Sequence, residues 1–228
     1  MDDWARDSIE ALKRHFDAVA DPERAEHMAA YMRNQFPFYG IGAADRKAIQ
    51  RDVWRALPPS SEPQELAVFA RGCYALRQRE WQNTAVSLLR RQARHLGPTD
   101  LSLVHELVTT KSWWDTVDEI AAHVVGRVVI DHPEAVAEMD EWVRSDDMWV
   151  ARTAILHQLG YKERTDASRL FAYCDLRADE SDFFYRKAIG WALRQYARTD
   201  PEAVRAYVEA NRGRLSRLTV REALKHLG

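Results

Sequence analysis

The sequence predicts an all-α protein built as a solenoid of HEAT-like helical repeats. Three observations indicate this fold class. Apolar residues recur at helical spacing almost everywhere, Pro and Gly interrupt the pattern at intervals, and short signatures return about every 35 residues. No segment alternates convincingly between apolar and polar residues, so we expect no β-strand.

The expected helices are bounded by turns that contain Pro or Gly. Apolar residues at helical spacing, such as Ile155, Leu156 and Leu159, fill the segments between the turns. The turns lie at Asp21-Pro22, Pro58-Pro59, Gly97-Pro98, His132-Pro133 and Asp200-Pro201. We therefore expect helices to end and begin at these places.

Two signatures carry the repeat. PEAV occurs at 133–136 and again at 201–204, and RKAI at 46–49 returns at 186–189, with the related copies NTAV, DEIA, RTAI and REAL. The first residues of the six copies lie 34 to 37 residues apart: Arg46, Asn83, Asp118, Arg152, Arg186 and Arg221. A period of this size is typical of stacked helix pairs, which gives about six pairs here. The tetratricopeptide and ankyrin signatures are absent.

The shared repeat position holds four arginines, one asparagine and one aspartate. In helical solenoids the second helix of each pair usually lines one concave surface. We therefore expect a concave, DNA-binding groove lined by cations, with the carboxylate of Asp118 in its middle, because a row of arginines suits the phosphates of a duplex. The alternative is that these residues are unrelated charges on solvated helix faces.

Composition is that of a globular protein, with 46% apolar and 30% charged residues among 228. We expect one domain over residues 1–228. Net charge is −2, but residues 184–228 carry ten basic and four acidic residues, so this segment is +6 and the remainder −8. The segregation favours a basic face, although an arginine-rich solvated tail is the alternative.

Several other classes of protein find no support in the sequence. No apolar run approaches the roughly 18 residues of a membrane span, and the acidic N-terminal stretch is not typical of a secretory signal. The two cysteines are isolated, so we expect a cytoplasmic protein. The eight histidines are dispersed, and neither a phosphate-binding loop nor a dinucleotide-binding fingerprint occurs, so we expect no metal site and no cofactor.

The stretch TKSWWDTVDEI at 110–120 is unusual because it crowds aromatic and acidic residues into the start of a helix. Ser112 is the expected N-cap, with Asp115 completing a capping-box pattern, so the helix would begin near Trp113. Trp113 shares one stripe with Val117 and Ile120, and we expect these three side chains in the core.

Trp114 and Asp118 lie one helical turn apart on a different stripe. Flanking arginines are expected to keep the Asp118 carboxylate ionised. Beside an indole, such a carboxylate forms a small site for positive charge, to which the ring adds about 0.5–2 kcal/mol of cation–π attraction. A plain structural role for Asp118 is the alternative.

A second tryptophan, Trp191, admits two interpretations. With Phe184 and Ala188 it forms a stripe typical of a core. However, Gly190 lies one turn after Arg186, on the expected groove side, where a missing side chain would let a ligand approach.

The chain also resembles a known family, the AlkD family of bacterial DNA alkylation repair glycosylases, which are built from HEAT-like repeats. The combination of TKSWWDTVD and KAIGWxLRxY is the specific part of this resemblance. The segments that carry it are AEHMAAYMRNQFPFYGI (25–41), TKSWWDTVD (110–118), SDDMWVARTAILHQLGYK (145–162), FFYRKAIGWALRQYART (183–199) and VREALKHL (220–227). They span nearly the whole chain, while the loop RALPPSSEPQE at 55–65 has no secure match.

The resemblance implies hydrolysis of the N-glycosidic bond of cationic N3- and N7-alkylpurines in duplex DNA, without base flipping. It implies Asp118 as the catalytic aspartate, with Trp114 and Trp191 flanking the sugar of the lesion. It also implies DNA contacts at Arg152 and Tyr31. The basic residues expected to hold the duplex are Arg46, Arg186, Lys187, Arg194 and Arg221.

The chemistry agrees with a single carboxylate. Ordinary glycosidases need two, because their leaving group must be protonated. An alkylpurine with a fixed positive charge can leave without a general acid, and no lysine is placed as a Schiff-base candidate. We therefore expect a monofunctional, monomeric enzyme without cofactor. The competing class is a helical-repeat scaffold that binds nucleic acid or protein without chemistry, because fold alone does not determine function.

Overall fold

The computed structural model describes residues 3–227, and these residues form helices joined by short connections, with no strand among them. The predicted all-α class and the helical-repeat architecture are confirmed. The described residues fall into two compact units, divided between Leu96 and Gly97. The expected DNA-binding groove and the single domain stay predictions.

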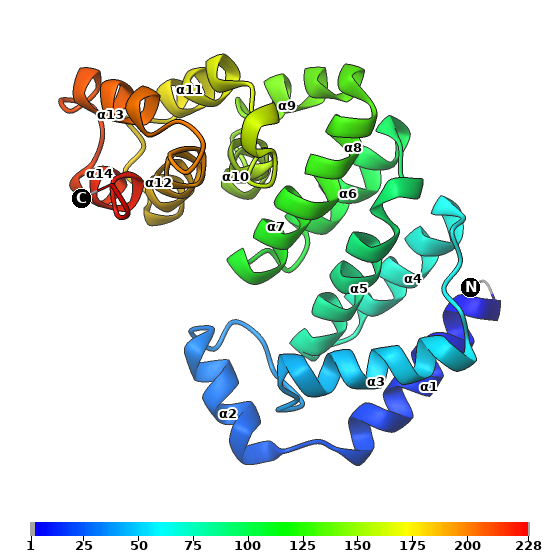
Figure 1. Ribbon diagram of the computed structural model, residues 1–228. Coiled ribbons are helices and arrows are strands. Elements are labelled where there is room, and N and C mark those ends of the chain that lie inside the picture. Colours follow the sequence, from blue (N-terminus) through cyan, green and yellow to red (C-terminus); the bar gives the residue numbers. More distant parts are fainter. Residues whose placement is uncertain (1–2, 228) are drawn as a thin grey trace. The chain divides into compact units, whose positions relative to one another are not determined.

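The first unit contains five α-helices and one 3-10 turn among its described residues (Figure 1). Its hydrophobic core includes Leu12, Phe16, Leu66, Phe69 and Trp81, all at most 1% exposed. The helices are α1 (Asp3–Ala18), α2 (Pro22–Tyr31), α3 (Ala43–Ala56), α4 (Pro63–Ala75) and α5 (Arg79–Gln92), followed by η1 (Ala93–His95).

The connection between α2 and α3 is fixed by a buried carboxylate. Glu80 on α5 accepts backbone N–H bonds of 3.0–3.1 Å from Tyr39, Gly40 and Ile41. Gly40 has a φ of 89°, and a Cβ there would lie 2.1 Å from the carbonyl oxygen of Asp21. Only glycine fits this backbone and this close approach.

The second unit contains the remaining helices. They are α6 (Leu101–Thr109), α7 (Trp114–Ile120), α8 (Gly126–Asp131), α9 (Val136–Trp142), α10 (Met148–Leu156), α11 (Ala167–Leu176), α12 (Phe183–Tyr196), α13 (Pro201–Ala210) and α14 (Arg217–Ala223), with the 3-10 turns η2 (Pro98–Asp100), η4 (Pro133–Ala135) and η5 (Lys162–Arg164). No helix in the described part of the chain is long and apolar enough to cross a membrane.

Side-chain caps set where most of the later helices begin. An Asp or Ser side chain that precedes the helix accepts backbone N–H groups of its first turn, which otherwise lack partners. These caps are Asp147 before α10, Asp166 before α11, Asp182 before α12, Asp200 before α13 and Ser216 before α14. The regular capping explains why the helices restart at each repeat.

Two layers of helices run through the C-terminal part of this unit, with α9, α11 and α13 in one and α10, α12 and α14 in the other (Figure 1). The first layer is tied by a hydrogen bond that recurs with the repeat. Tyr173 donates to Asp140 across 33 residues, and Tyr207 donates to Asp175 across 32, both at 2.7 Å. The sequence period thus appears as contacts between neighbouring repeats.

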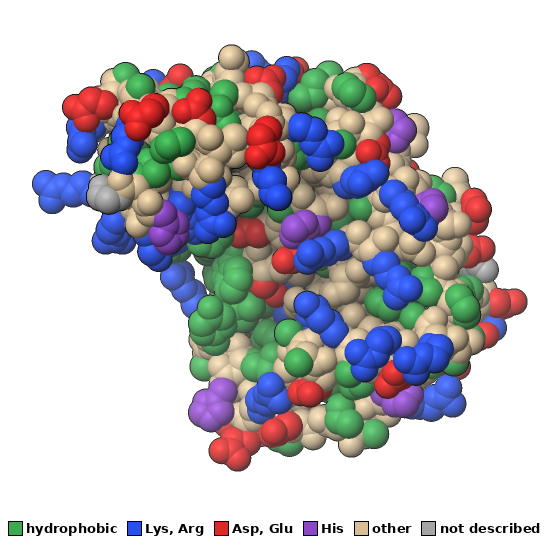
Figure 2. Space-filling view, viewed as in Figure 1, with side chains coloured by type: hydrophobic (Ala, Val, Ile, Leu, Met, Phe, Trp, Pro, Cys, Tyr) green, Lys and Arg blue, Asp and Glu red, His purple; other side chains and the backbone are tan. Residues whose placement is uncertain are grey.

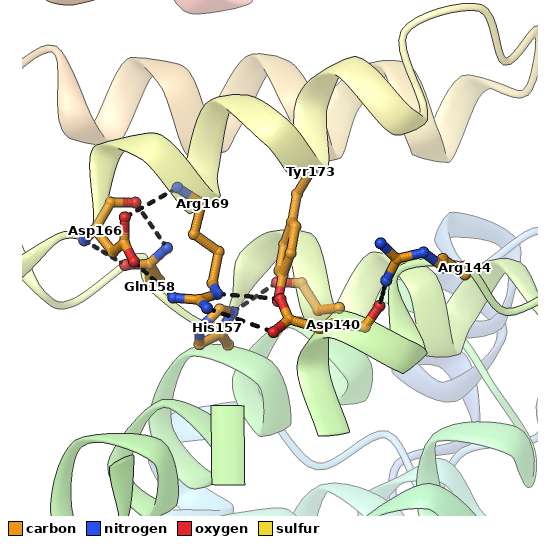
Figure 3. A network of polar contacts seen from close by, with 8 residues as sticks. Asp140, Arg144, His157, Gln158, Asp166, Arg169 and Tyr173 are labelled. Carbon is orange, nitrogen blue, oxygen red and sulfur yellow. Dashed lines mark hydrogen bonds and ion pairs between the residues drawn. The ribbon is translucent and has the colours of Figure 1, made fainter. Parts of the chain in front are cut away.

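A polar network joins α9, α10 and α11 (Figure 3). Arg169 and Tyr173 donate to the Asp140 carboxylate at 3.1 and 2.7 Å. Buried His157 lies beside them, with Nδ1 2.6 Å from the carbonyl oxygen of Ala154. Burial lowers the pKa of His157 to about 4, so the ring is neutral in the folded protein.

The helix that begins with α7 does not continue as a plain α-helix. A π-helical segment at Ala121–Val125, η3, separates α7 from α8. After it, a Cβ at Gly126 would lie 2.4 Å from the carbonyl oxygen of His157, so glycine is what lets α8 pack this closely. Tyr161 also donates to the carbonyl of Gly126 at 2.8 Å. Segments of this kind are frequent at functional sites.

Candidate active site

The start of α7 differs from the prediction. Trp113, not Ser112, is the N-cap, with extended backbone and no side-chain cap bond, so the predicted capping box is wrong. Lys111 has a left-handed backbone conformation (φ 50°), and the extended backbone of Trp113 directly precedes the helix. The amide groups of Thr116 and Val117 donate to the carbonyl of Trp113 at 3.2 and 3.1 Å.

Only part of the expected core stripe lies in the core. Val117 and Ile120 are fully buried, as predicted. Trp113 is only half-buried and packs against Trp149 and Phe184, with ring centroids 5.8 and 5.2 Å away. As an N-cap outside the helix, Trp113 does not follow the helical stripe.

Asp118 on α7 faces Arg152 on α10. The Arg152 guanidinium donates to both carboxylate oxygens of Asp118 at 2.7 Å, and its third nitrogen donates to the carbonyl of Phe184 at 2.5 Å. The Arg152 side chain is 1% exposed, whereas that of Asp118 is 17% exposed. The carboxylate therefore keeps one edge toward solvent while a buried cation holds the other.

Opposing effects act on the proton affinity of Asp118. The pKa of the Asp118 carboxyl is raised above its usual value, mainly by burial and also by the carboxylates of Asp115 and Glu119. The hydrogen bonds and charge of Arg152 act in the opposite direction. Both carboxylate oxygens accept N–H bonds from the guanidinium, which is the arrangement of a carboxylate ion and an arginine. The ionised state expected for Asp118 stays a prediction.

Trp191 on α12 lies near the same Arg152 guanidinium. The guanidinium carbon of Arg152 is 5.4 Å from the centroid of the Trp191 ring, within range of cation–π attraction. Lys187 and Arg194 also lie near this half-buried ring, at 5.2 and 5.9 Å. The fold thus places Asp118 and Trp191 around one arginine, with Trp114 one turn before Asp118 on α7.

Glu222 on α14 is the residue of this site that the sequence reasoning missed. It accepts hydrogen bonds from Lys187 at 2.9 Å, Trp191 Nε1 at 3.2 Å and Arg194 at 3.0 Å. Burial acts to raise the pKa of Glu222, but these donors outweigh it and the pKa is lowered. A signal existed in the repeat, because REAL places Glu222 at the position that Lys187 holds in RKAI, 35 residues earlier.

Gly190 has a different role from the one expected. A Cβ at this position would lie 2.6 Å from Cβ of Glu222 and 3.1 Å from the carbonyl oxygen of Thr219. The expectation that Gly190 opens the groove to a ligand is therefore wrong. Its missing side chain makes room for α14, which packs directly on α12.

The other basic residues of the shared repeat position do not form a row of exposed cations. Arg152 is buried, and half-buried Arg186 donates to the carbonyl of Glu180 at 3.1 Å. Arg221 is exposed. Arg152 and Arg186 thus direct their guanidinium groups to acceptors within the protein, Arg152 to Asp118 in the preceding repeat and Arg186 to the connection before α12.

Two predicted residues lie in the first unit. Tyr31, the last residue of α2, is 73% exposed, and Arg46 on α3 is 8% exposed. Their proposed contacts with DNA stay predictions.

Exposed cations do gather at the C-terminal helix. Arg217, Arg221 and Lys225 follow each other at intervals of four residues along and just beyond α14, and none of the three forms an ion pair with a described residue. Figure 2 shows Lys and Arg side chains at the left, in the region of α12–α14, below Asp and Glu side chains along the upper edge; further Lys and Arg side chains lie over other parts of this face. We call these three residues the α14 basic stripe.

Other reactive groups are scarce in the described residues. No group of three or more His, Cys, Asp or Glu side chains there could hold a metal ion. Cys73 and Cys174 are buried, and burial raises the pKa of both thiols, which makes them poor nucleophiles.

Comparisons with known proteins agree with one another. The family model of DNA alkylation repair enzymes matches residues 12–227. A solved structure described as a predicted DNA alkylation repair enzyme from Enterococcus faecalis has a TM-score of 0.81 and 30% identity, covering 92% of this chain and 97% of that one. A comparison with curated proteins found no match.

Proposed function

The chain belongs to the family of DNA alkylation repair enzymes, and from that premise we propose that it is a monofunctional DNA glycosylase. Its proposed substrates are cationic N3- and N7-alkylpurines in duplex DNA, whose N-glycosidic bond it hydrolyses. The observation that carries the proposal is the partly exposed Asp118 carboxylate, which accepts two hydrogen bonds from buried Arg152, whose guanidinium also lies 5.4 Å from the Trp191 ring.

The proposed reaction needs one carboxylate. As the cationic base departs, positive charge develops on the deoxyribose, and the exposed edge of Asp118 stabilises it and orients the attacking water. The two bonds from Arg152 fix this carboxylate before the substrate arrives, so little reorganisation is needed in the transition state.

The tryptophans have a supporting part in the mechanism. Trp114 and Trp191 pack on the sugar of the lesion and exclude water, which strengthens the electrostatic effect of Asp118. A leaving group that is already charged needs no base-binding pocket with its own acid. We therefore propose that the base is not flipped into an enclosed pocket.

DNA binding is proposed to rest on phosphate contacts. The α14 basic stripe supports this proposal, because its exposed cations form no ion pair with a described residue. We propose contacts with DNA also at Tyr31, Arg46 and Arg186. Of the other predicted contacts, Arg152 is proposed to act through Asp118 instead, because it is buried against that carboxylate. Lys187 and Arg194 are proposed to contribute less than free cations would, because Glu222 binds both. The proposed enzyme acts as a monomer, on DNA in the bacterial cytoplasm.

Release of free base by the purified protein tests the proposal. Duplex DNA containing N7-methylguanine is incubated with excess enzyme, and free base is measured by chromatography. We expect release by the wild type and none by Asp118→Asn, while binding to undamaged duplex stays nearly unchanged, because Asp118 acts on charge that develops in the transition state.

The matched control is Asp175→Asn, which removes the same charge from an aspartate on α11. Asp175 accepts a bond from Tyr207 and does not contact Asp118, Arg152 or Trp191 through any hydrogen bond, so this variant should keep its activity. Binding to DNA without release of any base would instead indicate a helical-repeat scaffold and refute the glycosylase.

A further inference from the structure

Three donors converge on a single carboxylate beside the candidate active site. Glu222 Oε1 accepts from Lys187, and Oε2 accepts from both Trp191 and Arg194. All three donors lie on α12, with Lys187 four residues before Trp191 and Arg194 three residues after it. They therefore share one face of α12, and α14 supplies the only acceptor in this set of bonds.

We propose that Glu222 is a positioning residue: its carboxylate fixes the orientation of the Trp191 indole and holds Lys187 and Arg194 against α14. The effect of this arrangement on catalysis rests on the proposed glycosylase function. The arrangement itself does not, and it can be measured separately.

The indole orientation has consequences beyond Trp191. The Arg152 guanidinium lies 5.4 Å from the Trp191 ring centroid and also donates both hydrogen bonds to the Asp118 carboxylate. A ring held at its Nε1 keeps its face toward Arg152. Released from Glu222, the ring would be free to turn and to leave the position in which it packs on a substrate. Small losses of orientation of this kind lower rates more than they lower binding.

The backbone of α12 and α14 is built to bring Glu222 this close. Gly190 leaves the space in which the Glu222 Cβ lies, and Thr219 donates its hydroxyl to the carbonyl of Arg186 at 3.2 Å. The side chain of Glu222 is 11% exposed. Its position is therefore set by helix packing rather than by a flexible surface side chain.

Glu222 also changes the charge that α12 presents. The carboxylate balances one of the two cations that it binds and restrains both. Without it, Lys187 and Arg194 would be free to reach phosphates. Glu222 is thus expected to weaken DNA binding in the wild type while it supports catalysis.

The experiment compares Glu222→Ala and Glu222→Gln with a matched control, Asp175→Ala. Asp175 also accepts a bond between neighbouring repeats, from Tyr207 at 2.7 Å, but on the other helix layer. Three quantities are measured: the single-turnover rate of N7-methylguanine release, the salt dependence of binding to undamaged duplex, and the indole N–H resonance of Trp191. The resonance is assigned by its loss in Trp191→Phe.

We expect Glu222→Ala to release base about tenfold more slowly and to bind undamaged DNA with a salt slope steeper by up to about two units. The Trp191 indole resonance should shift and lose its protection from exchange. Glu222→Gln should recover part of the rate, because its amide oxygen can still accept the indole N–H, but it should keep the steeper slope. Asp175→Ala should change none of the three quantities.

Two outcomes would overturn the proposal. One is an unshifted indole resonance together with an unchanged salt slope in Glu222→Ala. The other is an equal loss of rate in Glu222→Ala and Asp175→Ala, which would indicate general destabilisation. If the wild type releases no base, the glycosylase function fails, while the resonance and the salt slope still decide the role of Glu222.

Discussion

Asp118 and Arg152 lie 34 residues apart in the chain and face each other through two parallel hydrogen bonds of 2.7 Å. They hold the same position in consecutive repeats, and their opposite charges meet where the repeats stack. The pair is therefore a product of the repeat itself. It leaves an aspartate with a fixed orientation and a partly exposed edge.

Arg152→Lys tests whether this arginine acts through Asp118 or through DNA. A lysine keeps the charge but cannot form the paired bonds to both carboxylate oxygens. We expect the single-turnover rate of base release to fall by about tenfold or more, since Asp118 loses its fixed orientation. The salt slope for undamaged duplex, measured by fluorescence anisotropy, should stay as in the wild type. A slope flatter by about one unit would show that Arg152 contacts a phosphate instead.

The charge of the lesion should decide which bases are released. The candidate site offers the Asp118 carboxylate held by an arginine. Its other carboxylate, Glu222, is bound by three donors and has a lowered pKa, so it is not suited to protonate a neutral base. N7-methylguanine and a bulkier N7-alkylguanine should both be released, because a site that does not enclose the base has no wall to exclude the larger one. Uracil should not be released. Identical duplexes carrying each lesion provide the comparison, and efficient release of uracil would refute this mechanism.

The α14 basic stripe should account for part of the salt dependence of DNA binding. Replacing Arg217, Arg221 or Lys225 by Ala should flatten the slope of log K against log salt by about one unit for each phosphate that the variant no longer neutralises. The matched control is Arg212→Ala on the connection after α13, because Arg212 is also exposed but pairs with Glu209. If the control flattens the slope as much as the stripe variants do, the stripe has no special role.

His157 should make the fold sensitive to acid. Its pKa is about 4 in the folded protein, against about 6.5 when unfolded, so its contribution to stability is present above pH 6.5 and is lost as the pH falls toward 4. The loss should reach about 2 kcal/mol of unfolding free energy by pH 5.

Urea unfolding of His157→Phe between pH 7 and pH 4.5 provides the measurement. The variant removes this group, while Asp140, Asp166 and Arg169, the charged groups near His157, remain. The free energy of unfolding of His157→Phe should therefore fall less steeply with decreasing pH than that of the wild type. The control is His226→Gln, at an exposed position, whose free energy of unfolding should change with pH as in the wild type. Equal slopes in all three proteins would rule out His157 as the cause.

Much of the fold could be predicted from the sequence, because helical repeats record their period directly. The six copies of the signature all begin on helices, α3, α5, α7, α10, α12 and α14, and turns that contain Pro or Gly fall between helices. Val117 and Ile120 are buried as their spacing predicts. Local patterns suffice for such features, since they depend on one helix at a time.

Contacts between repeats could not be predicted in the same way. A period shows that Arg152 and Asp118 hold equivalent positions, but not that stacking brings them together and buries the arginine. For the same reason the sequence did not indicate that Glu222 belongs to the site, and it led to the wrong role for Gly190. In each case the outcome depends on how closely one helix approaches the next, which a single-helix pattern does not contain.

The π-helical segment at 121–125 makes the helix between Asp118 and Gly126 one residue longer than plain α-helical geometry would need to join the same two ends. The surplus residue is absorbed within one wide turn, so both flanks keep their orientation. Deleting one residue from this segment is therefore expected to preserve two contacts. Asp118 should still accept the hydrogen bonds of Arg152, and Gly126 should still pack against the carbonyl oxygen of His157. Among related sequences, a gap of one residue at this place would not signal a lost function, and a search pattern with fixed spacing between the two residues would overlook genuine members.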